Sequence, residues 1–262
     1  MRLTVFASGS GGNCALLSAD GVHVLLDAGI SFRKIKENLA LSGLAPEALS
    51  AVLITHEHSD HIGGLATFVK KCAVPICAPR TVASRLRYTI AGVEQCLREV
   101  PDEIPFSLGC LRVNCFHTPH DTEESVGWRI ESGSGCFALA TDMGCVTETV
   151  QAGLRGADTV LIEANHDTEM LRYGPYPPAL KRRILSDHGH LSNENCGILA
   201  AYLAERGTKQ IVLGHLSREN NTPEKAFAAV KAALGERETT LYVAPAYGRL
   251  TLEWEKERLC SE

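Results

Sequence analysis

The sequence lacks several features that assign proteins to particular classes. No run of 18 or more apolar residues occurs, which excludes a transmembrane helix of ordinary length. The start becomes polar within nine residues, too early for a signal peptide, so we expect a first β-strand there. The 10 cysteines include no Cys-x-x-Cys pair, and the Gly-rich turn at residues 8–13 lacks the Gly-x-Gly-x-x-Gly spacing of a dinucleotide site. The sequence therefore predicts buried, reduced cysteines in a cytoplasmic protein.

An excess of positive charge is also absent. The chain has 26 Lys and Arg against 31 Asp and Glu, a formal net charge of −5. This argues against binding nucleic acid through overall charge, although a local basic groove stays open and the charge of bound metal is not counted. The composition is ordinary for a globular protein, and 262 residues suffice for one large α/β domain or two small ones. We expect a single domain over residues 1–262.

The densest cluster of chemically active side chains lies at residues 55–64, T-H-E-H-S-D-H-I-G-G. It follows the apolar run 51–54, which is typical of a buried strand, and a helix is expected from about 62 to 71. Several side chains on such a loop can converge on one point. A divalent metal needs imidazole and carboxylate donors held at about 2.0–2.2 Å. The pattern therefore predicts a metal site, the alternative being a solvated polar loop.

Two passages of the chain repeat one another about 110 residues apart. An apolar strand ending in Asp27-Ala28-Gly29 is echoed by the strand at 136–144, which ends in Asp142 and Gly144. The strand and polar cluster at 51–60 are likewise echoed at 158–167. We expect two related βα halves around one site. A third strand, at 210–214, leads into His215.

Further elements follow from local patterns. We expect strands at 14–18, 22–26, 74–78, 240–244 and 249–254. We expect helices at 31–41, at 81 to about 89, from the cap Ser192 to about 206, and from the cap Thr222 to 235. The residues 259–262 are expected to fray.

The H-x-H-x-D-H pattern resembles the signature of metallo-β-lactamase-fold hydrolases. The resemblance implies an αββα four-layer sandwich with two divalent metal ions where the sheets meet. It also implies the ligands His56, His58, Asp60, His61, His120, Asp142 as a bridge, and His215. His120 is the best match to the family's H-T-P-G-H element, which lacks its Gly here, and His117 is the alternative. Zinc or manganese is expected, and such ligands also accept iron.

Two such ions, roughly 3.5–4 Å apart, would hold a hydroxide that is a strong nucleophile at neutral pH. Gly189-His190-Leu191-Ser192 and Glu163-Ala164 resemble elements of tRNase Z. The resemblance implies that His190 is the general acid and that Glu163 orients it and raises its pKa. The alternative is a helix-start His with a structural bond only. We count Asp60, His190 and Glu163 as catalytic.

Longer strings at residues 163–167, 174–177, 186–193 and 216–221 resemble the YycJ/WalJ-like branch of the superfamily. This resemblance implies a cytoplasmic phosphodiesterase, a 5′-to-3′ exonuclease on double-stranded DNA. No His precedes Glu163, and the tRNA-gripping arm of tRNase Z is not evident, which weakens a tRNA-processing role. The alternatives are hydrolysis of a small phosphodiester, ester or thioester, and a non-catalytic, metal-stabilised regulatory protein. No oligomeric partner is indicated.

Substrate contacts are expected in the second half of the chain. The basic run at 181–183, after the stiff segment 176–178, can contact phosphates or form a solvated helix face. The expected substrate-binding residues are Tyr176, Lys181, Arg182, Ser192 and Arg218.

Two further positions have open roles. Asp27 can cap the helix at 31–41 or, as the resemblance suggests, brace the metal loop from behind. His166, with its neighbour Asp167, can join the metal shell.

Overall fold

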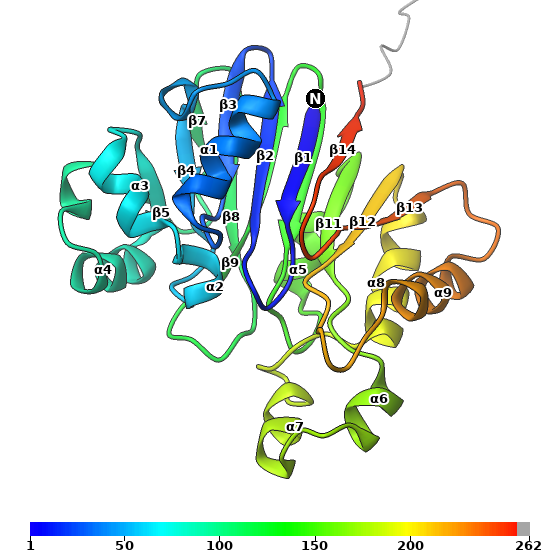
Figure 1. The fold of residues 1–262 in the computed structure, drawn as a ribbon. Helices are drawn as coiled ribbons and strands as arrows, with labels where there is room; N and C mark the ends of the chain where they lie inside the picture. Colours follow the sequence, from blue (N-terminus) through cyan, green and yellow to red (C-terminus); the bar gives the residue numbers. More distant parts are fainter. Residues whose placement is uncertain (256–262) are drawn as a thin grey trace, which may run out of the picture.

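The computed structural model describes residues 1–255, whose strands form two sheets of seven strands each. In Figure 1 the two sheets stand against each other along their length. The first sheet has the order β14 (Leu250–Glu253), β1 (Arg2–Ala7), β2 (Cys14–Ala19), β3 (Val22–Leu26), β4 (Ala51–Leu53), β5 (Ile76–Pro79), β6 (Leu97–Val100). The second has the order β13 (Thr240–Val243), β12 (Gln210–Gly214), β11 (Thr159–Glu163), β10 (Gly135–Ala140), β9 (Val126–Ser132), β8 (Leu111–His117), β7 (Phe106–Leu108).

Helices cover the outer face of each sheet. The first sheet carries α1 (Phe32–Leu41), α3 (Leu65–Lys71) and α4 (Arg80–Thr89), and the second carries α5 (Glu148–Leu154), α8 (Asn193–Ala204) and α9 (Pro223–Leu234). The short helices α6 (Thr168–Tyr173) and α7 (Pro178–Ile184) lie beyond the edge of the sheets (Figure 1), and α2 (Ser59–Ile62), η1 (Pro46–Ala48) and η2 (Val93–Gln95) complete the set. The predicted αββα four-layer sandwich is confirmed.

The central core lies between the sheets, and alternation along the strands explains it. Leu3 and Val5 of β1 face the second sheet, whose Trp128 and Phe137 belong to the same apolar cluster. Residues of β4 pack alternately on the second sheet and on the helices, so both faces of this strand are buried. A strand buried on both faces needs a continuous apolar run, which is the pattern seen at 51–54.

The internal repeat is visible in the pairing of the strands. Three adjacent strands of the first sheet, β2, β3 and β4, pair in the same way as β9, β10 and β11 of the second sheet. In each set an antiparallel pair is followed by a parallel pair. Strands β3, β4, β8, β10, β11 and β12 therefore end at one edge of the sandwich, the lower edge in Figure 1. Polar residues that follow these strands meet there.

Most predicted elements are found within a few residues of their expected bounds. The helix predicted at 62–71 is α3, which begins at Leu65, and Asp60 and His61 lie in the short helix α2 rather than in the predicted loop. Ser192 and Thr222 cap α8 and α9 as expected. The expectation for residues 259–262 lies outside the described residues. No disulfide joins cysteines within residues 1–255. None of the helices in this range has both the length and the apolar surface to span a lipid bilayer.

Candidate metal centre

Three imidazoles converge at the shared edge of the sheets. His56 and His58 come from the loop after β4, and His120 comes from the loop after β8. Nδ1 of His58 lies 3.1 Å from Nε2 of His56 and 3.2 Å from Nε2 of His120. Nδ1 of His120 lies 3.3 Å from the carbonyl oxygen of Gly189, which fixes the proton on Nδ1 and leaves the Nε2 lone pair facing the other rings.

A second cluster lies beside the first and contains carboxylates. Oδ2 of Asp60 lies 3.6 Å from Nε2 of His61 and 3.4 Å from Nε2 of His215. The buried carboxylate of Asp142 lies between the clusters. Its Oδ2 is 3.2 Å from Nε2 of His61, and its Oδ1 is 3.6 Å from Nε2 of His215 and 3.7 Å from Nε2 of His120. The two oxygens of Asp142 therefore face imidazole nitrogens of both clusters.

Asp27 holds the far side of the second cluster. Its Oδ2 lies 2.8 Å from Nδ1 of His61, and its Oδ1 accepts a 2.8 Å hydrogen bond from the backbone N–H of Thr55. Helix α1 is capped by Ser31 instead, whose hydroxyl accepts from the N–H of Lys34. Asp27 thus orients His61 so that Nε2 points into the cluster, the arrangement expected of a carboxylate behind a metal-binding imidazole.

Glu163, at the end of β11, holds two imidazoles with one buried carboxylate. Its Oε1 lies 2.8 Å from Nδ1 of His190 and 2.8 Å from Nδ1 of His215. Its Oε2 accepts hydrogen bonds from the backbone N–H groups of Met143 and Leu191. Burial acts to raise the pKa of Glu163, but the charge of His190 and the hydrogen bonds from both imidazoles outweigh it and lower the pKa to about 2. Glu163 is therefore an anion that fixes both rings.

Burial and nearby charges also shift the pKa of His190 in opposite directions. Burial acts to lower its pKa, and the carboxylates of Glu163 and Asp142 outweigh burial and raise it. The side chain of His190 is 20% exposed. Its ring centre lies 5.2 Å from that of His120 and 5.3 Å from that of His215. His190 therefore stands next to both clusters with Nδ1 held and Nε2 left for a substrate.

The donor atoms fit divalent cations. Ligands bound at about 2.0–2.2 Å in tetrahedral geometry are roughly 3.3–3.6 Å apart, close to the separations within both clusters. Burial acts to lower the pKa of His61, yet Asp142 and Asp27 raise it to about 10, so this pocket strongly favours positive charge. Burial and the charge of His61 lower the pKa of His56 well below its usual value, which keeps that imidazole neutral and able to donate a lone pair. The residues thus form a His/carboxylate site suited to a divalent metal.

A cleft of about 330 Å³ opens onto this centre. One wall is α7 with the segment before it, which contributes Tyr176, Leu180, Arg183 and Ile184. The other lining residues are Ser10, His58, Ser59, Asp60, His120, Asp121, Asp142, Asn165, Gly189, His190, His215 and Ser217. Substrate can therefore reach the metal-binding atoms and His190 from the same side.

The alternative histidines lie elsewhere. The side chain of His117 is 50% exposed and lies 3.9 Å from Oε1 of Glu124, away from the clusters. His166 is buried, and among residues 1–255 it belongs to none of the groups that can hold a metal. The neighbouring Asp167 caps α6, accepting from the N–H of Met170, and pairs with Lys225.

The predicted substrate-binding residues lie partly inside and partly outside the cleft. Tyr176 lines the cleft. Nζ of Lys181 donates to the carbonyls of Arg172 and Gly174, so it ties α7 to the end of α6. Arg182 is exposed outside the cleft lining, and the hydroxyl of Ser192 is used as the cap of α8.

Arg218 donates to the hydroxyl of Tyr247 and also lies outside the cleft lining. Sequence reasoning gave no separate role to Arg183 or Asp121, which do line the cleft. Arg183 belongs to the basic run at 181–183. Which of these three side chains faces the cleft depends on how α7 is turned about its axis, and only the structure shows this.

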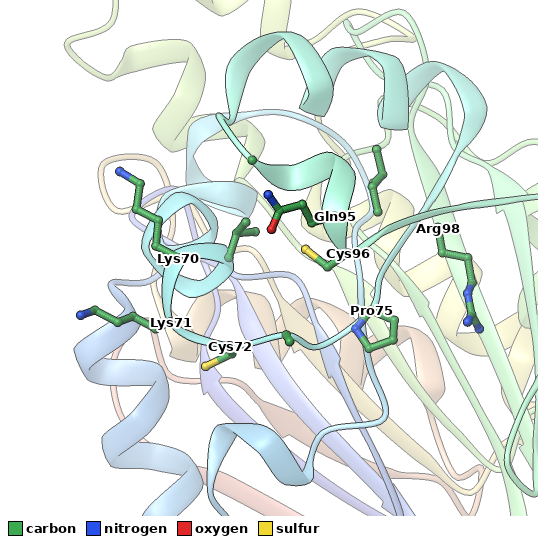
Figure 2. Close-up of a pocket in the computed structure, with 11 residues that line it drawn as sticks. Lys70, Lys71, Cys72, Pro75, Gln95, Cys96 and Arg98 are labelled. Atoms are coloured by element: carbon green, nitrogen blue, oxygen red, sulfur yellow. The ribbon is translucent and has the colours of Figure 1, made fainter.

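A second pocket, of about 470 Å³, lies between α3, η2 and β6 (Figure 2). Its lining includes Lys70, Lys71, Cys72, Cys96 and Arg98 but no His, Asp or Glu. Figure 2 shows Lys70 and Lys71 extending outward from the helix rather than toward a common point. This pocket offers no set of convergent donors, in contrast to the cleft at the metal centre.

Comparisons with known proteins show the family to which this chain belongs. Residues 23–216 match the family model described as "Beta-lactamase superfamily domain". The chain is 35% identical over 240 residues to "Exodeoxyribonuclease YycJ" of Bacillus anthracis, covering 90% of each chain. It is 37% identical over 230 residues to "Exodeoxyribonuclease WalJ" of Streptococcus pneumoniae, covering 86% of this chain and 85% of that one.

Among solved structures, the metallo-β-lactamase fold protein YhfI from Bacillus subtilis superposes with a TM-score of 0.72 at 16% identity, covering 96% of this chain and 99% of that one. At 16% identity this likeness concerns the fold alone, whereas the two relatives above are 35% and 37% identical to this chain. The chain is a metal-dependent hydrolase that belongs to the β-lactamase superfamily and, within it, to the family of YycJ and WalJ.

Proposed function

We propose that this protein is a nuclease with two divalent ions, zinc or manganese with iron as the alternative, and that it degrades double-stranded DNA from 5′ to 3′. The observation that supports the proposal is the Glu163–His190 pair: its two side chains are 2.8 Å apart, and His190 lines the cleft, where it would serve as an acid. A sugar alkoxide is a poor leaving group and needs a proton from such an acid. The relatives named exodeoxyribonucleases supply the choice of DNA.

The residues divide into two ligand sets that share one carboxylate. His56, His58 and His120 would hold one ion, and Asp60, His61 and His215 the other. Asp142 would contact both, because its two oxygens face donors of both sets. When bound, a pair of divalent ions supplies an activated water at neutral pH and neutralises charge on the phosphoryl group.

The chain's own residues then position and move protons. His190 gives its Nε2 proton to the leaving oxygen, and Glu163 keeps the ring in place through Nδ1. Asp60 is 22% exposed, whereas Asp142 is 3% exposed, so Asp60 is the more accessible of the two carboxylates to solvent and substrate. We therefore assign Asp60 to catalysis as well as to ion binding.

End-labelled duplexes test the proposal directly. Purified protein with manganese or zinc should release a 5′ label as a short product at once, while a 3′-labelled strand shortens progressively. Asp142→Ala should abolish both, and Asp102→Ala, in an exposed loop, should change neither. Parallel reactions with RNA, bis(p-nitrophenyl) phosphate and lactoylglutathione test the other substrates. Failure to hydrolyse any nucleic acid with zinc, manganese or iron would contradict the proposal.

A further inference from the structure

The cleft contains several carboxylates, whereas the proposed substrate, nucleic acid, is a polyanion. The carboxylates of Asp60, Asp121 and Asp142 all line it. Among the lining residues within 1–255, Arg183 alone is a Lys or Arg. Phosphate contacts from cationic side chains provide a large share of the affinity of proteins for nucleic acid. Arg183 is therefore the protein cation best placed to meet a substrate phosphate at this site.

The guanidinium of Arg183 is directed by Asp121. Nε of Arg183 donates to Oδ2 of Asp121, and Oδ1 of the same carboxylate lies 3.3 Å from Nε2 of His120. One carboxylate thus separates the guanidinium from a ligand atom of the metal centre. The side chain of Arg183 is 56% exposed, so solvent and substrate can reach it. A guanidinium has five N–H donors in a planar fork, and only the Nε–H is used by this contact with Asp121.

The backbone that carries Arg183 is packed against the loop that carries His190. The N–H of His190 donates to the carbonyl of Ile184 over 3.0 Å. A Cβ at Gly189 would lie 2.2 Å from the same carbonyl oxygen and 2.3 Å from that of Arg183, so only glycine allows this approach. The position of Arg183 is therefore fixed relative to His190, as binding of two neighbouring phosphates requires.

We propose that Arg183 binds the phosphate next to the scissile one and that Asp121 orients its guanidinium for this contact. The inference rests on the proposed nuclease function and specifies how the same site recognises its substrate. Phosphates recur about every 3.4 Å along the axis on each strand, so a strand with one phosphate at the metal centre brings the next close by. Lys181 cannot serve equally, because its ammonium already binds two carbonyls of the α6–α7 segment.

The test compares Arg183→Gln with Arg33→Gln, a matched loss of charge at an exposed arginine of α1 that does not line the cleft. Arg183→Gln should raise KM for a labelled duplex about tenfold or more, the effect of losing a hydrogen bond to a charged group, while kcat is retained. The slope of log affinity against log salt should fall by about 0.9, as expected for one lost phosphate contact. Bis(p-nitrophenyl) phosphate has no neighbouring phosphate, so its KM should not change. Arg33→Gln should resemble the wild type.

The Asp121→Asn variant distinguishes two roles of Arg183: binding of a phosphate, and simple attachment of α7 to the loop that carries Asp121. If Arg183 only anchors α7, Arg183→Gln and Asp121→Asn will lower the Tm equally and leave the salt slope unchanged, and this result would overturn the inference. A wild type that cleaves duplex DNA beside an Arg183→Gln variant with unchanged KM and slope would overturn it as well. A wild type without any nuclease activity would instead refute the proposed function.

Discussion

Replacement of His190 by alanine tests the chemistry of the centre most directly. The imidazole stands beside both ligand clusters, with Nδ1 bound to Glu163 and Nε2 facing the cleft. Its loss removes the proton donor without removing a metal ligand. General acids contribute about 10²–10⁴-fold to a rate, or roughly 3–5.5 kcal/mol of barrier. We expect a loss of this size in kcat on duplex DNA, whose leaving group is an alkoxide.

The assay pairs DNA with bis(p-nitrophenyl) phosphate. The p-nitrophenolate ion leaves readily without a proton, so His190→Ala should slow its release by less than about tenfold. Metal content, measured on the same preparations, should match that of the wild type. His188→Ala is the matched control, because His188 is exposed, lies two residues away and does not line the cleft.

The result depends on how much His190→Ala lowers the rate on DNA compared with the rate on bis(p-nitrophenyl) phosphate. If His190→Ala slows DNA and bis(p-nitrophenyl) phosphate equally, with the metal retained, His190 is not the acid. Glu163→Gln is expected to differ from both, because Glu163 also holds His215, a proposed metal ligand, through Nδ1. That variant should lose metal as well as rate.

Three further changes have defined outcomes. Asp27→Asn weakens the hold on His61, and metal affinity measured by competition with a chelator should fall about 10–100-fold. Gly29→Ala places a Cβ 1.7 Å from the carbonyl oxygen of Asp60, so the metal loop must shift, and calorimetry should show a loss of about 1–3 kcal/mol together with metal. Asp167→Ala removes the cap of α6 and should cost about 1 kcal/mol at neutral pH in urea unfolding. Burial acts to raise the pKa of Asp167, but the N–H of α6 and a lysine ammonium lower it. The contribution of this carboxylate is therefore complete above the ordinary Asp pKa of 3.8 and should vanish as pH falls through the lower folded value.

The sequence predicts those parts of the fold and site that depend on local pattern. Residues 55–64 bring four candidate ligands together, two in the loop after β4 and two in the short helix α2, and the strand before them is buried on both faces, as its unbroken apolar run requires. The repeated strand-Asp-x-Gly passages predict that Asp27 and Asp142 occupy related places. In the structure they follow β3 and β10, which pair in the same pattern within their own sheets.

Some contacts across the chain could not be predicted. The resemblance implied that Glu163 orients His190, 27 residues away, but no pattern indicated that Glu163 also accepts from His215, 52 residues away. The same limit applies to Arg183, whose position in the cleft depends on the phase and placement of α7. The proline-rich segment before α7 indicated stiffness but not a helix packed over the metal centre.

The backbone at the metal centre shows why the whole fold is needed to form it. Asp27, Asp142 and His215 each follow a strand and each have positive φ, between 54° and 57°. This conformation costs a non-glycine residue of order 1–3 kcal/mol, although Asp and His tolerate it better than most. Neighbouring groups stabilise it: the N–H of Asp27 donates to the carbonyl of Leu53, and the N–H of His215 donates to the hydroxyl of Ser8. Because these contacts join different strands, the side chains meet only when both sheets are formed and packed, so metal affinity should disappear together with the sandwich rather than before it.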